Sequence, residues 1–345
     1  MDALNWLRTL LWQAKEIFPI EVALTLGLAF FALSWVVPRR LVSLPSRERR
    51  ASALTWLGIC GSLALLAVAT GTSWLGYRAG VVDASGFDGW WRRPAPLLAA
   101  ALVVALGAAV LSREPRPAPG ERALAPRRHW WAFTPRAPLW TAIGAAGVLA
   151  LTAGWHTLIG VSAPAGANRF GIVPEATDLP VYFTVLGGSG YAAGAGWPNH
   201  LVTLLAIGAA AAALCTALAA DANRPASARV SAADTRAERT ATARMMVLLV
   251  LGGLLLTLGA VCAFIGFAGD RSIGIDLIMA PADPDALPVF GGSDYQAFAP
   301  LMHRGGYVIQ GLGAALLLRL AVDTVRAAVR WNRAAAEQPA VSVAP

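Results

Sequence analysis

The sequence predicts an all-α polytopic membrane protein, and three observations support that class. Hydrophobic residues make up 57% of the 345-residue chain, whereas charged residues make up only 14%. A soluble domain usually carries about 25% charged residues, because water must solvate its surface. The apolar residues also occur in long blocks, and the arginines gather in alternate segments between those blocks. Together these features predict a chain that is surrounded mostly by hydrocarbon.

Seven apolar blocks are long enough to cross a bilayer as helices. A hydrocarbon core of about 30 Å requires about 20 residues at the helical rise. The predicted spans are 19–37, 53–76, 96–112, 138–160, 200–220, 245–267 and 305–325. We therefore expect a transmembrane domain over 19–326 and a disordered cytoplasmic tail over 327–345.

Apolar residues at helical spacing precede the first span. They predict an amphipathic interfacial helix over 1–18, with Trp6 and Trp12 at the level of the headgroups. A simple extension of the first span is the alternative.

Arginine placement predicts the orientation of the spans. Twenty of the 28 basic residues lie in 38–51, 113–137, 221–244 and the chain from Arg319 onward. The positive-inside rule predicts that these segments lie on the cytoplasmic side of the plasma membrane. The amino terminus is then outside and the carboxyl terminus inside. A basic chain can also indicate nucleic-acid binding, but arginines between apolar blocks favour lipid headgroups as the partner.

Two long outer loops, 161–199 and 268–304, share a motif. Each contains Leu-Pro-Val and an aromatic residue, followed by Gly-Gly-Ser-x-Tyr, which ends at Tyr191 in one loop and Tyr295 in the other. Matching glycines in the preceding helices lie at nearly the same offset, and a near-constant offset is typical of duplication. The apolar content of the loops predicts a small packed cap with short extended segments, and the Gly-Gly-Ser turns predict equivalent places for the two tyrosines.

The repeat predicts the architecture of the bundle. The two units cover about 138–220 and 245–325, and a degenerate third copy over 53–112 is left open. Because each unit starts on the same side, the copies are parallel repeats. We expect one solitary helix plus two or three helical hairpins, with structured extracytoplasmic loops that meet on the outer face.

Polar residues near the outer ends of the helices are the candidate binding residues. The set comprises Asp178, Tyr191, His200, Asp285, Tyr295, His303 and Arg304. A metal site would require several of them to converge, but the chain contains no HxxxH or HExxH spacing. We therefore predict no metal and no cofactor.

Three polar residues lie inside predicted spans. His156 is either a proton or ligand contact or a hydrogen-bonded histidine of the bundle. Arg319 and Asp323 are four residues apart, which predicts an ion pair on one helix face. A gating or partner-binding role is the alternative for that pair.

Small residues at four-residue spacing predict helix–helix contacts in three spans. The alternative is that an Ala-rich composition produces such stripes by itself. The stripes are Ala101, Ala105 and Ala109; Ala142, Ala146, Ala150 and Gly154; and Gly208, Ala212, Thr216 and Ala220.

Three functions agree with these features. The first is a non-catalytic membrane component, namely an accessory subunit, sensor or immunity-type factor, whose outer loops bind a partner or ligand. Its partners would include other membrane subunits, for example a transporter ATPase. The second is a transporter for an uncharged or amphipathic solute. The third is a membrane enzyme with an outward-facing site near His200 and His303, although no Walker lysine or GxSxG motif is present.

Overall fold

The computed structural model describes most of the chain. The described residues are 21–36, 41–78, 90–115, 117–123, 126–170, 177–270, 273–274 and 290–336. The predicted amphipathic helix at 1–18, the candidate residue Asp285 and the last nine residues of the predicted tail lie outside this set.

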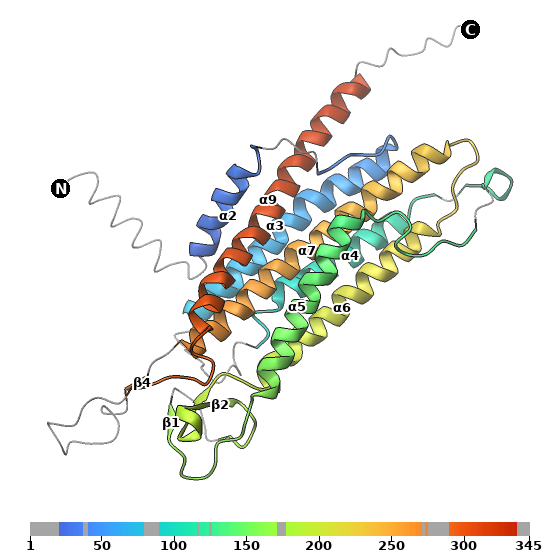
Figure 1. The fold of residues 1–345 in the computed structure, drawn as a ribbon. Helices are drawn as coiled ribbons and strands as arrows, with labels where there is room; N and C mark the ends of the chain where they lie inside the picture. The colour runs from blue at the N-terminus through green and yellow to red at the C-terminus, as the bar shows by residue number, and fades with distance from the viewer. Residues whose placement is uncertain are drawn as a thin grey trace, which may run out of the picture.

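The described part of the chain contains seven α-helices that run side by side along one long axis (Figure 1). Six of them are long and apolar enough to cross a membrane, which confirms the helical membrane class. The seventh helix lies in the first predicted span, and its described part comprises 13 residues. The bounds are α2 (Glu21–Leu33), α3 (Glu48–Arg78), α4 (Ala95–Ser112), α5 (Arg136–Leu158), α6 (Trp197–Ala222), α7 (Ala232–Gly269) and α9 (Ala299–Ala336).

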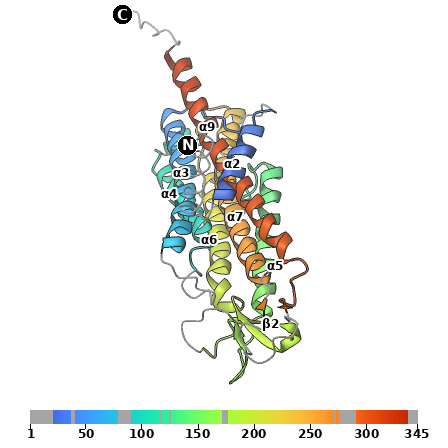
Figure 2. The same ribbon diagram turned by 90° about the vertical axis from the view of Figure 1, so that its left-hand side faces the viewer.

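Several helices extend beyond the apolar blocks that predicted them. α3 and α7 begin 5 and 13 residues before the predicted spans, and α9 ends at Ala336. The prediction of a disordered tail from residue 327 is therefore wrong for 327–336. Hydropathy detects only the part of a helix that matches lipid, whereas Ala, Arg and Glu continue the helix into water. The end of α9 projects past the other helices (Figures 1 and 2).

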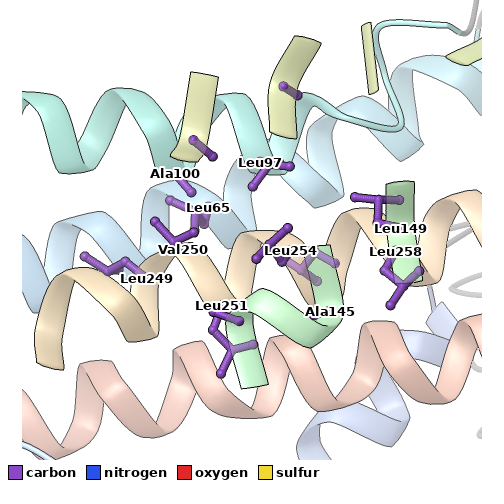
Figure 3. Packing of buried hydrophobic residues seen from close by; sticks show 14 of the residues in the cluster. Leu65, Leu97, Ala100, Ala145, Leu149, Leu249, Val250, Leu251, Leu254 and Leu258 are labelled. Atoms are coloured by element: carbon purple, nitrogen blue, oxygen red, sulfur yellow. The ribbon is translucent and has the colours of Figure 1, made fainter. Parts of the chain in front are cut away.

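α7 lies at the centre of the bundle. Its leucines pack against α3, α4 and α5, as Figure 3 shows for Leu254 and Leu258 beside Leu97 and Leu149. α7 and α9 approach through glycines: a Cβ atom on Gly259 would lie against the Gly306 carbonyl and the Gln310 side chain. Such close approach of backbones is a main source of helix association in lipid.

The predicted small-residue contacts are mostly wrong. Gly208, Ala212, Thr216 and Ala220 of α6 are all exposed. The buried residues of α6 instead recur at spacings of three or four, at Thr203, Ala206, Ala210, Leu214 and Ala217. A four-residue step advances about 40° beyond a full helical turn, so a strict stripe winds away from the contact. In the other two stripes only Ala101 and Ala142 are buried.

An ionic cluster joins the helix ends opposite the loops 159–196 and 270–298. Arg50 of α3 is 3% exposed. It binds Asp221 of α6 at 2.5 Å, donates to Thr242 of α7 and lies 3.8 Å from Glu114, just after α4. Four segments therefore meet at one buried guanidinium. We call this end of the bundle the Arg-rich end.

A second buried arginine fastens α2 to α9. Arg319 and Asp323 form an ion pair at 3.3 Å. Arg319 also donates to the Ser34 carbonyl, and its guanidinium lies 3.2 Å from the ring centre of Trp35. Asp323 accepts a hydrogen bond from the Leu41 amide. The short helix is thus fixed at its carboxyl end by polar contacts.

The opposite end of the bundle carries a small β-structure. Three strands pair in the order β1-β3-β2, with β1 parallel and β2 antiparallel to β3. The strands and short helices are β1 (Arg169–Phe170), β2 (Tyr182–Val185), η2 (Leu186–Gly188), β3 (Gly190–Ala193), β4 (Ile273–Gly274), β5 (Phe290–Gly291) and, at the Arg-rich end, η1 (Pro119–Glu121). Gly187 and Gly188 adopt positive φ in the turn between β2 and β3, as the glycine pair predicts.

The two loops contact each other. Val185 forms an isolated β-bridge with Ser293, and the Thr184 hydroxyl donates to the Asp294 carboxylate. The Ser293 hydroxyl in turn donates to the Gly269 carbonyl at the end of α7, at 2.7 Å. We call the three-stranded sheet together with 177–181 and 292–298 the cap (Figure 2). Short extended segments were predicted for these loops and are present.

Candidate functional site

A close approach of backbones sets the geometry beneath the cap. Gly196 caps the amino end of α6 with φ +88°, a conformation that favours glycine. A Cβ atom at this position would overlap the Pro180 carbonyl of the cap. The Gly196 amide donates to the His156 carbonyl at 3.1 Å, near the end of α5. The start of α6 is thereby held against the end of α5.

This contact places two histidines together. His156 Nδ1 lies 2.8 Å from His200 Nε2, and both side chains are fully buried. Two polar rings inside an apolar bundle are costly to bury unless they are hydrogen-bonded, and the 2.8 Å contact supplies that bond. His156 is thus a hydrogen-bonded histidine of the bundle, one of the two roles that its position predicts.

The second loop completes the group. The Tyr295 hydroxyl lies 3.3 Å from His156 Nε2 and 3.4 Å from the Ile265 carbonyl of α7. Its ring packs edge-on against Trp155 and is 4% exposed. Burial raises the pKa of Tyr295, so the phenol stays protonated and remains a donor.

The acceptors determine the direction of these hydrogen bonds. In the tautomer that matches donation from the Tyr295 hydroxyl to the Ile265 carbonyl, the Tyr295 oxygen accepts from His156 Nε2–H. In a neutral imidazole the other nitrogen then accepts, so His200 Nε2–H donates to His156 Nδ1. His200 Nδ1 is left as an acceptor, and it has no hydrogen-bond partner among the described residues.

Arg93 adds positive charge beside this chain of hydrogen bonds. It precedes α4, donates to the Asn199 side chain at 3.2 Å and lies 3.8 Å from the centre of the Phe264 ring. Asn199 is fully buried and donates to the Ala195 carbonyl at 2.7 Å. The group around the histidine pair therefore draws on α5, α6, α7 and the segments before α4 and α9.

The other predicted site residues are dispersed. His303 does not join His200: its Nδ1 lies 2.9 Å from the Ala263 carbonyl, and its ring packs on Tyr307. Asp178 and Arg304 are exposed. Within the part of the chain that the structure describes, no three His, Cys, Asp or Glu side chains come close enough to hold a metal.

The two tyrosines of the repeated motif have different surroundings. Tyr191 lies in β3, is only partly buried and packs in a small cluster inside the cap. Tyr295 instead reaches the core of the bundle. The prediction of equivalent places for these side chains is therefore wrong, because the strand that carries Tyr191 pairs within its own loop.

Sequence reasoning missed the pairing of His156 with His200 and the presence of Arg93. The two histidines lie 44 residues apart in different spans, and only the fold of the loop at Gly196 joins them. A weak signal existed for Arg93, since it is an arginine next to an apolar block on the side that is poor in arginine.

Comparisons with known proteins give no match, whether against family models, curated proteins or solved structures. The class of the protein therefore rests on its own geometry. It is a polytopic helical membrane protein whose two structured loops form a cap over a buried histidine–histidine–tyrosine group.

Proposed function

We propose that this protein is a non-catalytic component of the plasma membrane whose extracytoplasmic cap binds a partner protein or ligand. The Arg-rich end lies in the cytoplasm in this proposal, in accord with the positive-inside rule. The partner is another membrane subunit, such as one belonging to a transporter ATPase complex, or a molecule outside the cell.

One observation carries the proposal: Tyr295 belongs to the cap, yet its hydroxyl and ring contact His156 in the core. A partner that displaces the cap must also move Tyr295. The buried hydrogen bonds to α5 and α7 would then change, and such bonded groups have discrete arrangements. This contact supports a sensor or accessory role, because it connects the outer surface with the spanning helices.

A transporter is the second candidate, and the histidine pair favours it. Polar groups at membrane depth often mark paths for solutes or protons. His200 Nδ1 offers an unused acceptor to a passing hydrogen-bond donor. We rank this candidate second because the acceptor is fully enclosed and lies at one end of the bundle.

The first test uses an exposed residue of the cap. Asp178→Arg reverses a charge on the cap, whereas Ala118→Arg adds a charge to an exposed loop at the Arg-rich end. Each full-length variant would be cross-linked in native membranes, and its partners would be identified by mass spectrometry. We expect Asp178→Arg, but not Ala118→Arg, to reduce recovery of one specific partner several-fold.

Flux measurements separate the two candidates. If the purified chain alone carries a solute into liposomes, and its partners are unaffected by Asp178→Arg, the transporter replaces the accessory role. If neither flux nor a cap-dependent partner is found, the proposed function is wrong.

A further inference from the structure

A groove of about 820 Å³ runs along the outside of the bundle between α3 and α4. Its walls are mainly apolar, with Trp56 of α3 and Leu106 of α4 as large exposed side chains. In a membrane protein such a wall faces the hydrocarbon of the lipid. All residues that line the groove belong to α3 and α4, so the groove is separate from the cap and from the histidine pair.

Polar side chains occur at only one end of the groove. Glu48, Arg49 and Ser52 line the end at which α3 begins, and all three are exposed. The remaining lining on α3 runs from Ala53 to Ala64, a helical length of about 17 Å. That length matches about half of a 30 Å hydrocarbon core. The groove thus has the polarity and depth of one lipid leaflet.

The charges at the groove entrance are not used within the described protein. The neighbouring Arg47 and Arg50 form ion pairs with Glu238 and Asp221. Among the residues described, Glu48 and Arg49 form no ion pair with any side chain. One carboxylate and one guanidinium therefore stand side by side at the level of the headgroups.

We propose that this groove is a binding site for a zwitterionic phospholipid with an amine headgroup, of the phosphatidylethanolamine type. Arg49 binds the phosphate, for which a guanidinium has matching geometry. Glu48 binds the ammonium group, and one acyl chain lies along Trp56 and Leu106. An anionic lipid without an amine meets the Glu48 carboxylate and binds less well.

The test is lipid binding to the full-length protein, measured by native mass spectrometry. The probes are dioleoyl phosphatidylethanolamine and dioleoyl phosphatidylglycerol, which share their acyl chains. We expect the wild type to retain the ethanolamine lipid about fivefold more strongly, a ratio in keeping with one exposed charge pair. Glu48→Gln should remove this preference, and Arg49→Gln should weaken the retention of both lipids.

A filled groove gives a matched comparison. Ala53→Phe places a ring in the groove, whereas Ala105→Phe adds the same ring to an exposed position of α4 outside the lining. Ala53→Phe should abolish retention, and Ala105→Phe should leave it unchanged. Melting curves of both variants show whether they fold.

Cys60 provides a second readout, because this exposed cysteine lies within the groove. Bound ethanolamine lipid should slow its reaction with an apolar maleimide in the wild type but not in Ala53→Phe. Equal retention of both lipids by all variants would mean ordinary surrounding lipid only and would overturn the proposal. Protection of Cys60 by a co-purified subunit instead of lipid would overturn it as well.

Discussion

At the scale of single residues, burial gives His156 and His200 their particular dependence on each other. Each ring supplies the hydrogen bond that the other requires in an apolar medium. Removing one ring leaves a buried polar atom without a partner, whereas removing both leaves none. The pair should therefore behave as a unit in measurements of stability.

A double-mutant cycle tests this dependence. His200→Leu should lower the free energy of unfolding by about 1–3 kcal/mol, because His156 Nδ1 is left unpaired. The double variant His156→Leu/His200→Leu should lose less than the sum of the single losses. Thermal denaturation in mild detergent measures each value. The control is His303→Leu, which replaces a half-buried histidine outside the pair. Additive losses would show that the hydrogen bond does not contribute.

Arg50 tests the ionic cluster at the Arg-rich end. Arg50→Met should destabilise the protein by about 3 kcal/mol, because the largely enclosed Asp221 carboxylate loses its ion pair with Arg50 and the buried Thr242 hydroxyl loses a hydrogen-bond donor. Arg49→Met, one residue away and exposed, should change stability by at most about 0.5 kcal/mol. Denaturation of both variants at neutral pH is the measurement, and equal effects would contradict a buried role for Arg50.

At the scale of elements, glycines control how closely the helices pack. Gly259 of α7 and Gly306 of α9 face each other, so the two long helices approach through backbone atoms. Gly27 and Gly311 make a similar contact between α2 and α9. A side chain at either contact would have to push the two paired helices apart.

Gly259→Ala should therefore be costly although alanine favours helix. The added methyl group would meet the Gly306 carbonyl, and overpacking of this kind costs about 1–3 kcal/mol. Gly208→Ala, on an exposed face of α6 with open space around the Cβ position, should be neutral or slightly stabilising. The melting temperatures of the two variants in detergent check the difference, and a stable Gly259→Ala would contradict the packing of α7 on α9.

The positions of the helices could be predicted from sequence, whereas their contacts could not. Long apolar blocks locate a span because lipid selects for hydropathy alone. In an Ala-rich chain small residues occur on every helix face, so the stripe through Ala212 is explained by composition, the alternative to a helix contact, because Ala212 is exposed.

The candidate site was predictable only in part, for a related reason. His156, His200 and Tyr295 stand out in sequence as polar residues beside apolar blocks. Their convergence depends on the close approach of Gly196 to Pro180 and on the contact between the two loops. Such contacts between distant segments leave no local pattern in one sequence. The duplication of the two hairpins stays a prediction.

At the scale of the whole molecule, a membrane architecture requires that lipid surrounds the helices and that water reaches only their ends. The large exposed side chains at mid-helix positions agree with this requirement, since Leu102, Leu151 and Leu205 are 60%, 76% and 60% exposed. In water, such a surface would drive aggregation. The cap and the Arg-rich end are the parts that remain for partners on either side.

Spin labelling in a bilayer tests this central claim most directly. Single cysteines would replace Leu102, Leu151 and Leu205 in a variant that lacks the three native cysteines, and each would carry a nitroxide in lipid nanodiscs. We expect all three labels to collide more often with dissolved oxygen than with a water-soluble nickel chelate. A label at exposed Asp178 should show the reverse. Greater contact with the nickel chelate at the three leucine positions would contradict the membrane architecture and the functions proposed from it.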